Sequence, residues 1–209
     1  MMKSLLPYFY NLTYFKVLEW NLRDCRNVLD VGCGSDSPIG HIPHTFISEG
    51  IDAYKKSIDK SKKKKLHDHY RIGNIMKLNS FYKRKSFDAV VCLDVIEHLK
   101  PKDTVKLIHL MESIAIKKVI LLTPNGFYHQ HALEGNIYQV HQSGWKAGDL
   151  ADLGYKVFGL RGLQLLRDDH ASIKYRPWIF WGFCSFISEI IFYPFPGFCF
   201  DLFAVKNMR

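Results

Sequence analysis

The sequence lacks the paired cysteines that stabilise many small secreted proteins. Its five cysteines form no Cys-x-x-Cys pair, and their odd number leaves at least one thiol unpaired. This pattern favours free thiols in a reducing compartment over a disulfide framework or a zinc site. The first residues have no uninterrupted apolar stretch followed by a small-residue cleavage site, so the sequence predicts no secretory signal peptide and a cytoplasmic location.

Acidic residues are scarce relative to basic ones. The chain has 20 Asp and Glu against 29 Lys and Arg, which gives a formal net charge of +9. An excess of this size favours attraction to an anionic partner such as nucleic acid, a phosphorylated acceptor or a lipid head group. Much of it lies in a lysine-rich run from Lys55 to Lys65, for which a solvated helix face is the favoured interpretation.

Apolar residues, in contrast, are abundant enough for one large core. Of the 209 residues 47% are hydrophobic, so a single domain is the default expectation. Apolar runs alternate with helical stretches, which is typical of a parallel sheet covered on both faces. We expect strands near residues 28–31, 45–52, 70–73, 87–93, 118–123, 154–160 and 198–206. Helices are expected over 53–65, 101–116 and 145–153.

Two segments lie outside this alternation. Residues 1–26 are predicted to contain an amphipathic helix packed against a domain over 27–209, because apolar side chains recur at helical spacing at Phe9, Leu12, Phe15, Leu18 and Leu22. Residues 161–197 form an aromatic-rich insertion whose helix, over 178–193, is about 24 Å long and too short to span a bilayer. A buried cap over the active site is favoured for it, and a membrane-contacting lid and a dimer surface are the alternatives.

A glycine-rich turn follows the first expected strand, in the run Val-Leu-Asp-Val-Gly-Cys-Gly-Ser-Asp over 28–36. Gly32 and Gly34 can adopt backbone conformations closed to other residues, and they leave room for a ligand beside the backbone. A dinucleotide-binding turn would need a further glycine that this run lacks. Cys33 is interpreted as a small buried residue rather than a nucleophile.

Polar residues stand where the expected strands end, the edge at which an open parallel sheet binds its ligand. Asp30, Asp52, Asn74 and Asp94 all occupy such positions. Asp52 follows Gly34 by 18 residues, close to the separation at which an acid meets a ribose diol, and a helix N-cap is its alternative role. For Asn74 an adenine contact and a loop residue without a ligand remain open.

Together these segments resemble the class I S-adenosylmethionine (SAM) methyltransferases. The resemblance covers residues 27–206 and rests on Asp30-Val31-Gly32-Cys33-Gly34, Gly50-Ile51-Asp52, Gly73-Asn74, Phe87-Asp88-Ala89-Val90, Asp94-Val95-Ile96-Glu97-His98-Leu99 and Thr123-Pro124-Asn125. It implies an α/β fold with a doubly wound, mostly parallel seven-stranded sheet and an antiparallel last strand. It also implies SAM as cofactor. The predicted cofactor contacts are Asp30, Gly32, Cys33, Gly34, Asp52, Ala53, Asn74 and Asp94. The sequence departs from the family pattern where Asp36 replaces a glycine and Asn74 an aspartate.

Methyl transfer needs alignment of the reacting atoms and exclusion of water, and it needs no nucleophilic triad. His98 or His141 is predicted to serve as the general base for a hydroxyl or protonated amine acceptor, and a purely hydrogen-bonding role is the alternative for each. Tyr138 and Trp145 lie in a ring-rich loop after the fifth strand and are predicted to contact the acceptor.

A divalent cation is an alternative role for part of this region. Asp94, Glu97 and His98 stand at i, i+3 and i+4, and on a helical turn they would share one face. Two carboxylates and an imidazole can bind such an ion. The arrangement resembles the metal motif of some ubiquinone-pathway and small-RNA O-methyltransferases. The sequence does not favour a metal over a histidine that packs at a helix start.

The predicted function is SAM-dependent methyl transfer to a small-molecule or lipid-like acceptor, with peripheral membrane contact as a further hypothesis. RNA methylation is the second interpretation, supported by the positive charge. The sequence contains neither an N/D-P-P-Y/W motif nor a recognisable RNA-binding module. The third is a non-catalytic SAM-binding protein, because the last glycine of the turn is replaced.

Overall fold

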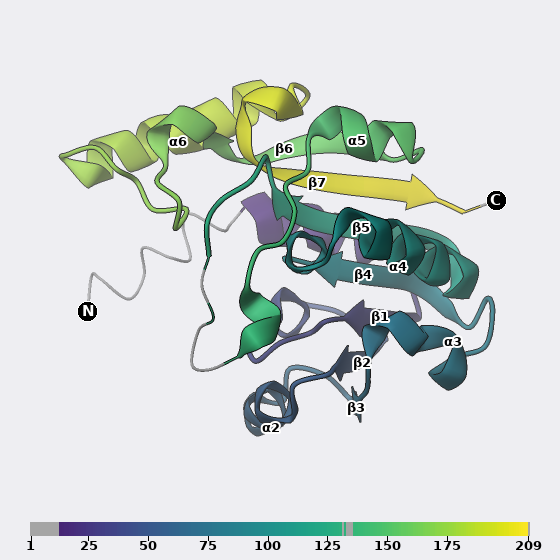
Figure 1. Ribbon diagram of the computed structural model, residues 1–209. Helices are drawn as coiled ribbons and strands as arrows, with labels where there is room; N and C mark the ends of the chain where they lie inside the picture. Colours follow the sequence, from purple (N-terminus) through teal and green to yellow (C-terminus); the bar gives the residue numbers. More distant parts are fainter. Residues whose placement is uncertain (1–12, 131, 133–135, 209) are drawn as a thin grey trace.

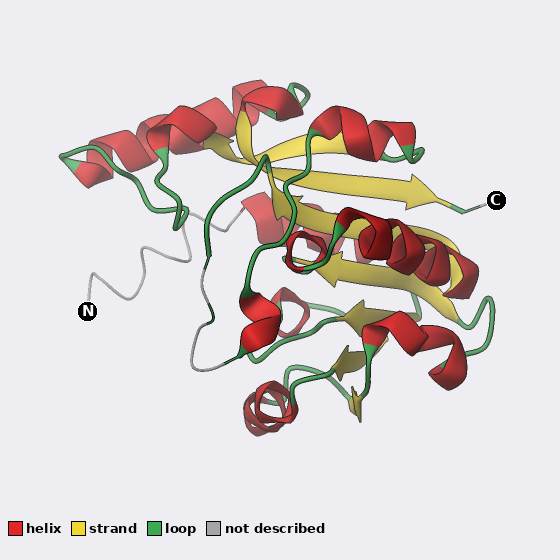
Figure 2. Ribbon diagram, in the orientation of Figure 1, coloured by secondary structure: helices red, strands yellow, loops and turns green. Residues whose placement is uncertain are grey.

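Seven strands form one central sheet in the order β3-β2-β1-β4-β5-β7-β6 (Figures 1 and 2). The computed structural model describes residues 13–130, 132 and 136–208. The strands are β1 (Asn27–Val31), β2 (Ile47–Asp52), β3 (His69–Ile72), β4 (Phe87–Leu93), β5 (Ala115–Pro124), β6 (Lys156–Leu163) and β7 (Cys199–Asn207). β1 to β5 run parallel, and β7 is antiparallel to β5 and β6. The predicted sheet and its antiparallel last strand are confirmed.

The order of the strands creates the position at which a ligand can enter. The chain passes from β1 to β2 and β3 on one side, and then returns to place β4 on the other side of β1. Loops that leave the carboxyl ends of β1 and β4 therefore turn in opposite directions and open a crevice between them.

Helices cover both faces of the sheet (Figure 1). They are α2 (Lys55–Lys64), α3 (Leu78–Phe81), α4 (Pro101–Ile114), α5 (Ala147–Asp152) and α6 (Trp178–Phe192). Short 3-10 turns lie at Pro38–His41, Ile75–Lys77, Ile96–His98, Ile137–Gln139, Gln164–Leu166 and Pro196–Phe198. α4 begins at a proline and buries Leu107, Ile108 and Met111 against the sheet, as its helical spacing of apolar residues requires.

The opposite face is covered by the N-terminal helix, described over residues 13–22. Tyr14, Leu18 and Leu22 are buried there against residues of β1, β4 and β7. This agrees with the predicted amphipathic helix. Phe9 and Leu12 lie outside the described residues.

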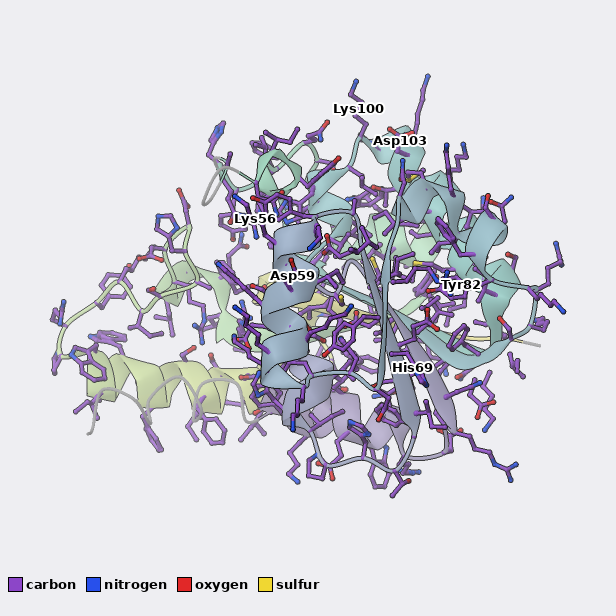
Figure 3. All side chains as sticks on the ribbon, turned by 90° about the horizontal axis from the view of Figure 1, so that it is seen from below. Lys56, Asp59, His69, Tyr82, Lys100 and Asp103 are labelled. Atoms are coloured by element: carbon purple, nitrogen blue, oxygen red, sulfur yellow. The ribbon has the colours of Figure 1, made fainter. Side chains whose placement is uncertain are left out.

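The lysine-rich run forms α2, which lies beside β2 and β3. It buries only Ser57, Ile58 and Ser61 and exposes its lysines, and Figure 3 shows Lys56 and Asp59 on the outer surface of the helix. A solvated helix face therefore describes this segment.

The insertion helix α6 corrects one sequence-based prediction. It packs on β6, at the opposite edge of the sheet from α2 (Figure 1), and it exposes most of its large apolar side chains. None of its residues lines the cavity described below. The favoured prediction of a buried cap over the active site is thus wrong. Among the described residues, no helix is both long and apolar enough to cross a bilayer.

Candidate functional site

A cavity of about 880 Å³ lies at the carboxyl ends of β1, β2 and β4. Cavities that bind cofactors and small ligands have volumes of about 300–1,000 Å³. The wall combines the glycine-rich turn, the start of the α2 segment, the loop after β5 and two residues of the N-terminal helix. It brings together these predicted site residues: Gly32, Cys33, Gly34, Asp52, Ala53, Asn74, Asp94, His98 and Tyr138.

The glycine-rich turn is held by its backbone. Gly32 and Gly34 have φ angles of +76° and +60°, the left-handed region that disfavours other residues. The N–H of Gly32 donates to the carbonyl of Ile51 in β2 at 2.8 Å. A Cβ on Gly32 would lie 2.6 Å from Cγ2 of Val95, whereas a Cβ on Gly34 would meet no protein atom within 4 Å. Gly32 is therefore required by packing, and Gly34 leaves space on the cavity side.

This difference predicts unequal losses of stability in the unliganded protein. We expect Gly32→Ala to lower the free energy of unfolding by about 3 kcal/mol, because a clash adds to the left-handed conformation. Gly34→Ala introduces no clash, so only the left-handed backbone conformation is unfavourable, and the free energy of unfolding should fall by about 1 kcal/mol. Urea denaturation of both variants measures the difference. Equal losses would show that Val95 gives way without cost.

Asp52, at the end of β2, braces this turn. Its Oδ2 accepts a hydrogen bond from the N–H of Gly34 at 3.0 Å, and its Oδ1 accepts one from the N–H of Tyr54 at 2.7 Å. Each carboxylate oxygen can accept a second hydrogen bond. Burial raises the pKa of the Asp52 carboxyl above its usual value, while the two backbone donors lower it. The side chain is thus positioned both to support the turn and to receive a diol.

Asp30 occupies a different place from the one predicted. It lies beneath the turn, is 2% exposed, and does not line the cavity. Its Oδ2 accepts a hydrogen bond from Oγ of Ser37 at 2.5 Å and lies 3.3 Å from Nε2 of the buried His67. Because a strand's last residues alternate between faces, Asp30 supports the turn from below and makes no direct ligand contact.

Cys33 and Asn74 complete this side of the cavity. Burial raises the pKa of the Cys33 thiol far above its usual value, so the thiol stays protonated. This agrees with a small buried residue rather than a nucleophile. Oδ1 of Asn74 accepts a hydrogen bond from the N–H of Met76 at 2.8 Å, while the side chain also lines the cavity. Asn74 therefore caps the turn after β3, and its contact with adenine stays a prediction.

Asp94 follows β4 with a φ of +55° and lines the cavity floor. Its carboxyl is open to the cavity yet surrounded by protein, and this burial raises its pKa, while Arg161 and His141 lower it. Arg161 also lines the cavity and pairs with Asp201 through Nε and Oδ2 at 3.0 Å. A single arginine near the end of a strand forms no recognisable motif, so sequence reasoning missed this residue.

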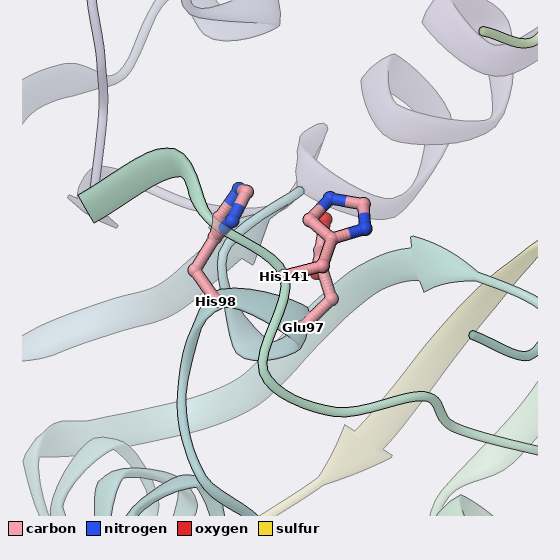
Figure 4. A group of neighbouring side chains, drawn as sticks. All are labelled: Glu97, His98 and His141. Carbon is pink, nitrogen blue, oxygen red and sulfur yellow. The ribbon is translucent and has the colours of Figure 1, made fainter. Parts of the chain in front are cut away.

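Two histidines and a glutamate meet beside the cavity (Figure 4). The rings of His98 and His141 have centroids 4.8 Å apart. One ligand atom from each of Glu97, His98 and His141 lies within 4.8 Å of the others. The 3-10 turn Ile96–His98 supplies the first two residues, and the loop after β5 supplies the third.

The electrostatics of this group keep both imidazoles neutral. Burial, and then the neighbouring His141, lower the pKa of His98 to about 4, and burial also lowers that of His141. Nδ1 of His141 lies 2.8 Å from the carbonyl oxygen of Tyr128. Since a carbonyl only accepts, Nδ1 carries the proton and Nε2 keeps its lone pair. Burial, and then Asp94, raise the pKa of Glu97 well above its usual value.

Of the two residues predicted to contact the acceptor, Tyr138 lines the cavity and Trp145 lies in the apolar core. Tyr138 lines the cavity and is 58% exposed. Trp145 is 6% exposed, belongs to the main apolar core, and donates from Nε1 to Oγ of Ser143 at 3.0 Å. The prediction for Trp145 is wrong, because its ring fills the core. Phe15, which the sequence suggested only as a helix packing residue, and its neighbour Tyr14 line the cavity.

Comparisons with known proteins agree with this geometry. Residues 29–118 match a family model described as a methyltransferase domain. No curated protein matches the chain. Many solved structures share the fold, among them the three that follow. The methyltransferase domain of bacterial CtHen1-CN is 17% identical over 97% of this chain and 100% of that one, with a TM-score of 0.59. The small RNA methyltransferase HEN1 is 15% identical over 95% of this chain and 25% of that one, with a TM-score of 0.62.

The third structure is the magnesium protoporphyrin IX methyltransferase ChlM from Synechocystis PCC 6803 with bound SAM. It is 15% identical over 100% of this chain and 80% of that one, with a TM-score of 0.52. The matched family model spans β1 to the start of β5, which are the strands that build the glycine-rich turn and the cavity floor. Residues 29–118 therefore resemble a methyltransferase domain, and the whole chain has the fold of the class I SAM-dependent methyltransferases.

Proposed function

We propose that the enzyme methylates a hydroxyl group of a small-molecule or lipid-like acceptor, and that the pair formed by His98 and His141 takes the proton. The observation that carries the proposal is this pair of neutral imidazoles, one of which lines the cavity that also contains the glycine-rich turn and Asp52. A neutral imidazole accepts a proton from an attacking hydroxyl, and a positioned base of this kind contributes about 10²–10⁴-fold to the rate.

The residues of the cavity divide into two parts. Gly32, Gly34 and Asp52 would hold the nucleoside and the adjoining chain of SAM, which supplies an electrophilic methyl group when it is bound. His98 and Arg161 line the other part of the wall, where the acceptor would lie. The protein aligns the acceptor oxygen with the methyl group and excludes water, which is the main requirement of this displacement.

The remaining wall favours an acceptor with an apolar body. Beyond the cofactor contacts the wall includes the rings and aliphatic side chains of Tyr14, Phe15, Leu99, Ile137 and Tyr138, beside polar side chains such as Asn136, Gln139 and Gln142. The exposed lysines of α2 stay outside it. These observations support a small or lipid-like molecule over RNA, although the fold resembles that of small RNA methyltransferases.

The side chains of Glu97, His98 and His141 could instead bind a divalent cation. Glu97 is buried without a cationic partner at hydrogen-bond distance among the described residues, and Nδ1 of His98 is buried without a hydrogen bond. His141 donates from Nδ1 to a backbone carbonyl, as histidines that bind metals through Nε2 commonly do. Glu97, His98 and His141 would hold the ion, which would lower the pKa of an acceptor hydroxyl.

One experiment tests the acceptor class and the cation together. The purified protein is incubated with a cell extract and SAM labelled in its methyl group, with and without EDTA, and products are separated by mass spectrometry. We expect a labelled O-methyl product in the small-molecule or lipid fraction. Label confined to RNA would overturn the proposal. Loss of the product in EDTA, with recovery on added Mn²⁺, would assign the cation; unchanged turnover would assign the histidine pair as the base.

A further inference from the structure

Helix α6 is oriented with its apolar side chains outward and its polar side chains inward. It buries Gly182, Ser185, Ser188 and Glu189 against the domain. The large side chains that it exposes by 38% to 63% of their surface are Ile179, Phe180, Phe183, Ile187, Ile190 and Ile191. A surface helix normally shows the reverse pattern, and contiguous exposed apolar patches mark sites of contact with a membrane or a partner.

Specific hydrogen bonds hold the helix in this orientation. Oγ of Ser185 donates to the carbonyl of Arg161 at 3.2 Å, and Oγ of Ser188 accepts from the N–H of Leu163 at 2.9 Å. At Gly162 an added Cβ would lie 2.2 Å from the backbone oxygen of Ser185, so the helix approaches the strand closely. Rotation of α6 to bury its apolar face would break these bonds and leave polar groups of β6 unpaired.

The exposed face is uncharged, and its flank is basic. Glu189, the only charged residue within α6, is buried. The segment that enters the helix carries Lys174 and Arg176, both exposed. Beside them the rings of Tyr175 and Trp181 lie 5.2 Å apart, and Nε1 of Trp181 donates to the carbonyl of Arg176. Amphipathic rings next to basic side chains are characteristic of segments that lie at the level of lipid head groups.

The apolar surface continues beyond the end of the helix. α6 has 15 residues and is therefore about 22 Å long. Phe198, 60% exposed, contacts Phe192 with ring centroids 5.5 Å apart, and Phe195 is 57% exposed. A helix of this length cannot cross the hydrocarbon core, but it can lie flat within the head-group region.

We propose that the outer face of α6 docks the enzyme on an anionic lipid bilayer, with the helix parallel to the membrane surface and Lys174 and Arg176 against acidic head groups. The apolar side chains would supply the affinity, and the two basic residues the preference for anionic lipid. The lysines of α2 take no part, because α2 lies at the other edge of the sheet (Figure 1). The docking surface is independent of the identity of the methyl acceptor.

Flotation of the full chain with phosphatidylcholine vesicles, and with vesicles that contain phosphatidylglycerol, tests the proposal. We expect strong binding to the anionic vesicles and a loss of about tenfold in Phe183→Glu/Ile190→Glu. Ile47→Glu is the matched control, because Ile47 is 58% exposed and Ile190 is 59% exposed. The control should bind as the unmodified protein does. Lys174→Glu/Arg176→Glu should abolish the preference for anionic vesicles while the weaker binding to neutral vesicles remains.

Circular dichroism and light scattering without lipid distinguish a loss of membrane binding from unfolding of a variant and from dimerisation through this face. All five substituted positions are exposed, so the variants should keep the native spectrum. Absence of binding to both vesicle types would overturn the proposal. A dimer of the unmodified protein that dissociates in Phe183→Glu/Ile190→Glu would overturn it in favour of a second copy of this chain as the occupant of the face.

Discussion

Asp52→Ala is expected to weaken SAM binding by at least about tenfold. Without the carboxylate, the protein would lose the hydrogen bonds to the ribose diol. Hydrogen bonds to a charged group contribute about 1.5–3 kcal/mol each. A loss of 1.4 kcal/mol already corresponds to about tenfold in affinity. The substitution also removes the oxygen that accepts a hydrogen bond from the N–H of Gly34, so the glycine-rich turn loses a stabilising contact.

Isothermal titration calorimetry with SAM and with S-adenosylhomocysteine measures this effect. Asp59→Ala is the control, because Asp59 lies on α2 in an exposed pair with Lys55 and does not line the cavity. Its affinity should match that of the unmodified protein. Unchanged binding by Asp52→Ala would contradict the role assigned to Asp52, and a loss in both variants would point to the packing of α2 instead.

His98→Ala and His141→Ala are each expected to reduce kcat by about 100-fold at neutral pH, with SAM affinity changed less than about twofold. In the proposed function the pair would supply the proton acceptor, and SAM would be held by the other part of the cavity. His129→Ala is the control, since His129 is exposed in the same loop and its ring contacts Phe127. A control loss as large as that of His141→Ala would indicate a general effect on the loop.

The pH dependence follows from the direction of the pKa shifts. A histidine acts as a base only when it is neutral, and burial lowers the pKa of His98 to about 4. The base form therefore persists as pH falls below the usual histidine pKa of about 6.5 and is lost as pH passes through the lowered value. We expect kcat to stay level down to about pH 5 and to fall below it. A decline centred near pH 6.5 would show that neither shifted imidazole is the base.

The binding half of the site could be predicted from sequence because its residues are tied to strand ends. Gly32, Gly34, Asp52 and Asp94 each stand at or just beyond the end of a strand, and the carboxyl ends of parallel strands meet at one edge. Asp30 is an exception to this reasoning. It stands in the same motif, yet its side chain is directed beneath the turn.

The part of the cavity proposed to hold the acceptor could not be predicted, because it is built from segments that are distant in the sequence. Arg161 comes from the end of β6, and Tyr14 and Phe15 come from the N-terminal helix, which reaches the cavity from the other face. Trp145 looked like a pocket residue by composition, but the loop after β5 turns its ring into the core. Composition identifies rings, whereas only the packing of the loop decides whether a ring faces a cavity.

By itself the sequence determined the doubly wound sheet and the glycine-rich turn, because these follow from local patterns of apolar and polar residues. SAM as cofactor is what the resemblance of its motifs to a known family implies. Only the tertiary structure decided how α6 is rotated. Its composition fits a buried helix equally well, since nearly every position is apolar. The hydrogen bonds from its serines to the end of β6 turn the polar face inward, and the apolar face is left on the surface.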